Sequence, residues 1–157
     1  MKRYCTLSGF LVLFFLLHGT VLKGQVTGLF RQGIHVIPYP QEVETLGQPF
    51  IVPAKISIVT ERNAPAEDRF TAEQLVRSLK EEFDIEGVVS NQASRGSITL
   101  SRKRVEKRLG PEGYELTSSP DGISVAANGS AGLFYGTQTL LQLIKKEGSS
   151  YSVPGLK

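Results

Sequence analysis

Apolar residues recur at helical spacing in two separate stretches of this chain. In the first, the apolar positions from Ala72 to Phe83 keep to one face of a helix. Pro65 suits the first turn because it has no backbone N–H to leave unpaired, and Glu67 and Asp68 suit the positive end of the helix dipole. The pattern predicts a helix that begins near Pro65 and ends near Phe83.

A second helix is predicted to begin near Ser130. Its apolar positions are followed by Lys145 and Lys146 and then by Gly148. Lysines in the last turn with a glycine just beyond them are typical of a helix end, so we expect this helix to end at the lysines. Its stripe runs through Leu133, Thr137, Leu140, Leu141 and Ile144.

Two apolar residues of the second helix lie off this stripe. At 100° per residue, the stripe and Phe134 occupy one arc of about 120°, which we expect to face a sheet. Tyr135 and Leu143 fall well outside that arc. We predict that both are exposed on this domain and form an interdomain contact with a second folded body. The alternative is two scattered surface residues, which are common on proteins.

Short alternating runs predict strands before and between the helices. The clearest is a hairpin from Gly113 to Ala127, in which Ser119 to Gly122 have the composition of a type I turn. Because neighbouring strands follow one another along the chain, we predict an α+β fold. It has a largely antiparallel β-sheet with two α-helices packed on one face. The other predicted strands cover residues 36–37, 42–46, 50–52, 55–60, 88–89 and 97–101.

The first 24 residues have the layout of a signal peptide. Two basic residues precede an apolar run from Phe10 to Leu17, which is well short of the ~20 residues that span a bilayer. Gly19 and Gly24 offer cleavage points, Gly28 is a further one, and the alternative is an uncleaved anchor. We therefore predict a secreted or periplasmic protein with no stable membrane span after cleavage.

Composition removes several classes of function. The leader holds three of the 18 basic residues and none of the 15 acidic ones, so residues 25–157 are balanced in charge. A neutral chain argues against a nucleic-acid partner, because phosphate binding needs a concentrated basic face. The only cysteine, Cys5, lies in the leader, and His35 is the only histidine after it. We therefore expect no disulfide, no metal site and no cofactor.

The remaining motifs are better explained by structure than by chemistry. The turn at residues 127–132 joins a strand to a helix but lacks the spacing of a phosphate-binding loop. Asn128 begins a glycosylation sequon, which we interpret as a structural turn, and the basic run at 102–108 as a solvated connection. His35 has no recognisable nucleophile beside it. No residue is assigned as catalytic, cofactor-binding or metal-binding.

Four blocks carry a resemblance to a known family. Along the chain, the blocks are Ile37-Pro38-Tyr39-Pro40-Gln41-Glu42-Val43, Glu112 to Leu116, Gly122 to Val125, and Ala131 to Leu143. Together they resemble the N-terminal domain of glycoside hydrolase family 20, the β-N-acetylhexosaminidases, over residues 34–157. The last block is the most specific.

The resemblance implies a non-catalytic domain whose sheet presses two helices against a following (β/α)₈ barrel. Catalysis in that family uses an adjacent Asp-Glu pair on the barrel and the acetamido group of the substrate, an exception to the usual two-carboxylate scheme. No Asp-Glu dipeptide occurs in these 157 residues.

We therefore expect a signal peptide at 1–24, a domain at 34–150, and a truncated lead-in to the absent barrel at 151–157. Glycan substrate, a terminal N-acetylhexosamine, would be bound only through the parent enzyme, and this chain alone would be inactive. The alternatives are a free-standing extracellular binding or adaptor module, and the front domain of a family 84 or α-glucuronidase-type glycosidase.

Overall fold

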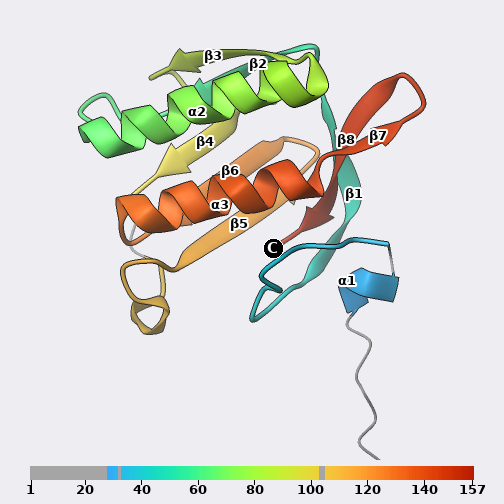
Figure 1. The fold of residues 1–157 in the computed structure, drawn as a ribbon, viewed down its shortest axis with the longest axis horizontal. Coiled ribbons are helices and arrows are strands. Elements are labelled where there is room, and N and C mark those ends of the chain that lie inside the picture. Colours follow the sequence, from blue (N-terminus) through green and yellow to red (C-terminus); the bar gives the residue numbers. More distant parts are fainter. Residues whose placement is uncertain (1–27, 32, 103–104) are drawn as a thin grey trace, which may run out of the picture.

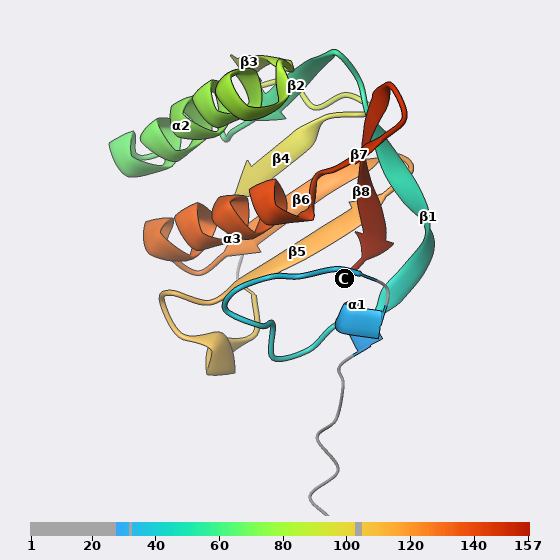
Figure 2. The ribbon, with the colours of Figure 1, turned by 45° about the vertical axis from the view of Figure 1, so that its right-hand side comes forward.

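The computed structural model describes residues 28–31, 33–102 and 105–157, so the predicted signal peptide at 1–24 lies outside the described residues. One eight-stranded sheet carries two long helices on the same face (Figures 1 and 2). In chain order the elements are α1 (Gly28–Arg31), β1 (Thr45–Val52), β2 (Lys55–Val59), α2 (Ala66–Phe83), β3 (Glu86–Ser90), β4 (Ile98–Ser101), the 3₁₀ turn η1 (Lys107–Leu109), β5 (Tyr114–Ser119), β6 (Gly122–Ala127), α3 (Ser130–Leu143), β7 (Lys145–Glu147) and β8 (Ser150–Leu156).

The sheet is mixed, with strand order β1-β8-β5-β6-β4-β2-β3 and with β7 paired to β8. Four of its pairings are antiparallel and involve β1, β5, β6, β7 and β8. The other three, which join β3, β2, β4 and β6, are parallel. The parallel pairing of β2 with β3 arises because α2 carries the chain from the end of β2 back to the start of β3. The predicted α+β class, with two helices on one face, is confirmed.

The hydrophobic core lies between the sheet and the two helices. Leu75 and Leu79 of α2 and Leu133 and Leu140 of α3 are fully buried against the sheet, where they meet residues such as Val125 of β6. Burying each of these side chains contributes about 1.5–3 kcal/mol before conformational entropy is subtracted. The helical spacing of the apolar residues is thus what builds this layer.

Both helices begin where the sequence predicts, but α3 ends earlier. Its last residue is Leu143, and Ile144 is already extended. The prediction that Lys145 and Lys146 form the last helical turn is wrong, because they form β7 and pair with Ser152 and Tyr151 of β8. Gly148, with φ of 63°, makes the turn of this hairpin instead of ending the helix.

Residues 151–157 belong to this folded domain. We expected them to be a lead-in to a barrel, yet they lie almost entirely in β8, between β1 and β5 in the sheet. Lys157, just after the strand, exchanges two backbone hydrogen bonds with Glu44, at 2.7 and 2.8 Å. A domain boundary at residue 150 would therefore cut the sheet; whether a barrel follows stays a prediction.

Candidate docking surface

The outward face of α3 carries no charged side chain. Its exposed residues are Ala131 and the four residues that lie three, four, seven and eleven positions after it, which are Phe134, Tyr135, Gln138 and Gln142. None of the 14 residues of α3 is acidic or basic. By contrast, the exposed residues of α2 include Glu73, Arg77 and Glu81. A solvated helix face is normally rich in charge, whereas the centre of a protein interface is depleted of it.

Tyr135 lies on this outward face, as predicted. It is 45% exposed, and its ring contacts that of Phe134 edge to face, with the centroids 6.1 Å apart. Phe134 is 36% exposed, although its position at 100° per residue predicted that it faces the sheet. The two rings form an exposed aromatic pair near the start of α3. The role of Tyr135 as an interdomain contact stays a prediction.

Leu143 is not on this surface. We predicted that it is exposed, but it is 2% exposed and belongs to the core. The reason is that α3 is flanked by α2 as well as covering β5, β6 and β8, so it buries a wider arc than a helix lying on a sheet alone. On the helical wheel the buried arc is centred on Gly136, Leu140 and Leu143. Leu143 therefore cannot contact a second domain without unfolding this one.

A proline-rich segment lies against the same helix. Residues 33–44 run from α1 to β1, and Ile34 and Val36 point into the core while Ile37 is 81% exposed. The side-chain amide of Gln142 accepts a hydrogen bond from the backbone N–H of Ile37 at 2.9 Å. It also donates to the Ile37 carbonyl at 3.1 Å. The sequence alone does not reveal Ile37 or Gln142 as site residues, because their contact joins positions 105 residues apart, which no local pattern encodes.

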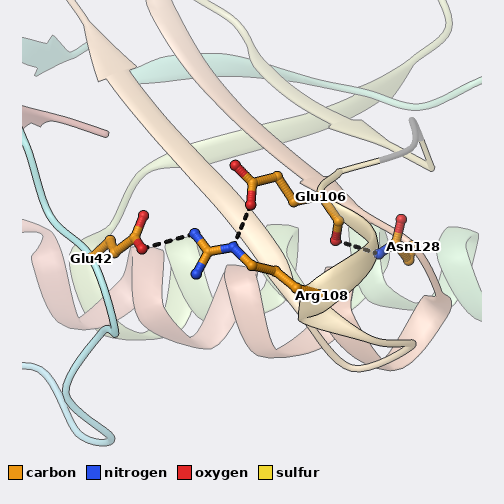
Figure 3. Close-up of polar contacts among 4 residues, drawn as sticks. All are labelled: Glu42, Glu106, Arg108 and Asn128. Atoms are coloured by element: carbon orange, nitrogen blue, oxygen red, sulfur yellow. Dashed lines mark hydrogen bonds and ion pairs between the residues drawn. The ribbon is translucent and has the colours of Figure 1, made fainter.

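Internal contacts occupy the turn that leads into α3. The Ser130 hydroxyl donates to the buried carboxylate of Asp68 on α2 at 2.6 Å. The side-chain amide of Asn128 donates to the carbonyl of Gly110 at 3.1 Å, and at 3.4 Å to that of Glu106 (Figure 3). Because this amide nitrogen is the atom that glycosylation would modify, the structural interpretation of the sequon fits the observed contacts.

Arg108 joins two segments that are distant in sequence. Its guanidinium donates to the Glu42 carboxylate at 2.8 Å and also to that of Glu106, and the three side chains are exposed (Figure 3). The hydrogen bond from Arg108 and its positive charge lower the pKa of Glu106. The arrangement holds the 105–109 connection beside the segment that enters β1. It is an exposed ion-pair network with a structural role.

Replacing Arg108 with glutamine should raise the pKa of Glu106 back toward its ordinary value. A lowered carboxyl pKa means that the interaction stabilises the fold above the ordinary Glu pKa and is lost as the pH falls through the lowered value. The measurement is an NMR titration of the Glu106 carboxyl carbon. Lys80→Gln is the control, since it should raise the lowered pKa of Asp84 and leave that of Glu106 unchanged. An unchanged Glu106 titration in Arg108→Gln would contradict this contact.

Across residues 28–31, 33–102 and 105–157, no group of three or more His, Cys, Asp or Glu side chains is placed to hold a metal ion. In the same part of the chain, no helix has the length and apolarity to cross a membrane. The ring of His35 packs edge-on against Phe30, with the centroids 4.9 Å apart.

Fold and surface together define a small α+β domain with one uncharged, partly aromatic helix face. Comparison with known proteins gives its family: the model for glycosyl hydrolase family 20, domain 2, matches residues 33–157. The chain belongs to this family. This is the family that the sequence resemblance predicted, so that prediction is confirmed.

Relatives of known sequence or structure are much longer. The chain is 29% identical over 136 residues to a β-hexosaminidase of Porphyromonas gingivalis, covering 82% of this chain and 17% of that protein. It resembles the N-acetyl-β-hexosaminidase of Streptomyces plicatus with a TM-score of 0.68 and 29% identity, over 83% of this chain and 26% of that one. It resembles a β-N-acetylhexosaminidase from Streptomyces coelicolor with a TM-score of 0.67 and 28% identity, over 77% of this chain and 25% of that one.

Proposed function

We propose that this chain is the non-catalytic domain of a secreted β-N-acetylhexosaminidase and that it supports a separate catalytic barrel. The observation that carries the proposal is the family match over residues 33–157. The chain spans 17% of the curated relative and about a quarter of the Streptomyces enzymes. Most of each relative, where the chemistry of this family is expected, therefore lies outside the matched part.

The outward face of α3 is the proposed contact with that barrel. Phe134 and Tyr135 present aromatic rings to water, and no charge lies on the helix to favour solvation. Aromatic anchors within an uncharged patch are typical of the central part of a protein interface. The proposal commits to the barrel because the lengths of the relatives leave room for a second domain. Secretion is supported by the leader-like pattern of residues 1–24.

The parent enzyme would remove terminal N-acetylglucosamine or N-acetylgalactosamine from glycans. That chemistry needs an Asp-Glu pair, and the 157 residues contain no such dipeptide. On this proposal the domain contributes no catalytic group, and its contribution to activity is the stability of the catalytic barrel.

An activity assay on this chain tests the non-catalytic assignment. Purified chain should release no product from a chromogenic N-acetylhexosaminide above a mock preparation from the same host, because it has no Asp-Glu pair. Turnover that follows the purified chain through a second column would overturn the assignment. Reading the coding sequence past Lys157 tests the barrel. A downstream frame with a barrel and an Asp-Glu pair is expected, and its absence would favour a free-standing module.

A further inference from the structure

A second exposed apolar feature lies beside the outward face of α3. Ile37 is 81% exposed and Tyr39 is 45% exposed. Pro38 and Pro40 alternate with them, and each proline ring fixes a backbone φ near −65°, so the two side chains are displayed on a stretch with little conformational freedom. No charged residue interrupts this stretch. An isoleucine left almost wholly in water gains from any apolar cover.

Gln142 fixes this stretch on the outward side of α3. Gln142 is itself one of the outward residues of the helix, and its amide bonds both backbone groups of Ile37, at 2.9 and 3.1 Å. Lys145 adds a hydrogen bond to the carbonyl of Gly33. Along the helix axis, Gln142 is about 10 Å from Tyr135, given the rise per residue. The two apolar features can therefore belong to one continuous contact surface.

The end of the chain lies beside the same segment. Lys157 pairs with Glu44, four residues after Pro40, through backbone hydrogen bonds of 2.7 and 2.8 Å. In both views the chain end, marked C, lies beside the segment that precedes β1 (Figures 1 and 2). Residues that follow Lys157 would therefore begin beside Glu44, at the end of the segment that carries Ile37 and Tyr39.

We propose that Ile37 and Tyr39, positioned by Gln142, form a second apolar anchor for the domain that follows Lys157. This inference rests on the proposed function, which supplies that domain. The partner surface is an uncharged apolar depression on the barrel, distinct from the part that covers Phe134 and Tyr135. Because the anchor is held by the domain's own side chain, it is ordered before the barrel arrives, which lowers the entropy cost of docking.

The test is hydroxyl-radical footprinting of the polypeptide encoded by the reading frame that runs through Lys157, compared with this chain alone. Modification of Tyr39, Ile37 and Tyr135 should fall several-fold in the longer polypeptide. Val88, exposed on the edge strand β3 at the far end of the sheet, is the reference and should not change. Protection of Tyr135 without Tyr39 or Ile37 would overturn this inference and leave the proposed function standing. A frame that ends at Lys157, or no protection anywhere, would overturn both.

Two glutamine variants test the positioning role. In the longer polypeptide, Gln142→Met keeps the length of the side chain but removes both hydrogen bonds to Ile37, so modification of Tyr39 should rise while that of Tyr135 stays low. Gln92→Met, at an exposed glutamine just after the edge strand β3, makes the same substitution away from this surface; it is the matched control and should leave both unchanged. If Gln142→Met also leaves Tyr39 protected, Gln142 does not position the anchor.

Discussion

Replacing Leu143 with alanine should lower the free energy of unfolding by about 2–5 kcal/mol, the usual range for a buried leucine. Leu143 is 2% exposed and lies in the core, so alanine would leave a cavity that the surrounding helices and strands fill only in part. Natural domains are stable by only about 5–15 kcal/mol, so this loss is a large fraction of the total. Denaturant unfolding, followed by circular dichroism, gives the free energy directly.

Tyr135→Ala is the comparison that makes this result informative. Its ring is 45% exposed on the same helix, so its removal should change the stability of this chain by no more than about 0.5 kcal/mol. The two residues were predicted together as interdomain contacts, and the experiment separates them. A Leu143→Ala protein that is as stable as Tyr135→Ala would mean that Leu143 is not in the core.

The location of α3 was predictable from the sequence, but its orientation was not. Its start at Ser130 follows from the strand-to-helix turn before it. The wheel placed the buried face on the large apolar residues, including Phe134, whereas the buried arc also contains Gly132, Gly136 and Thr139. Small residues carry little weight in a hydrophobic pattern, yet they are what allows the sheet to approach the helix. The face that the hydrophobic pattern predicts to be buried is therefore rotated about the helix axis relative to the face that is buried in the structure.

Strand pairing was the other feature that the sequence did not specify. The hairpin of β5 and β6 was predictable, because its turn and its alternation are local. The parallel pairings of β2 with β3 and β4 join residues that are far apart in the chain, and no local pattern encodes them. The predicted strands at 42–46 and 50–52 are replaced by one strand, β1, whose irregular pairing with β8 hides its alternation. The same limit concealed Ile37, whose partner Gln142 is 105 residues away.

Gly132→Val should destabilise the chain by about 3 kcal/mol, at the upper end of the range for overpacked sites. A Cβ atom at this position would lie 2.5 Å from the backbone carbonyl oxygen of Gly113 and 3.0 Å from the Cβ of Ala127. This oxygen belongs to the backbone just before β5 and cannot rotate aside as a side chain does, so α3 itself must shift. Any shift loosens the contacts of Leu133 and Leu140 with the same sheet.

Gly132→Ala and Gln138→Val separate the two effects that compete here. Alanine is a better helix former than glycine by about 1 kcal/mol, so helix propensity alone predicts that Gly132→Ala stabilises the chain. The steric contact acts in the opposite direction, and since the neighbour is backbone we expect it to win, with a net loss smaller than that of valine. Gln138→Val places the same side chain on the outward face, where only a few tenths of a kcal/mol should be lost. The measurement is denaturant unfolding. Stabilisation by Gly132→Ala would show that α3 has room to move away from the sheet. It would contradict the close packing that directs Phe134 and Tyr135 outward.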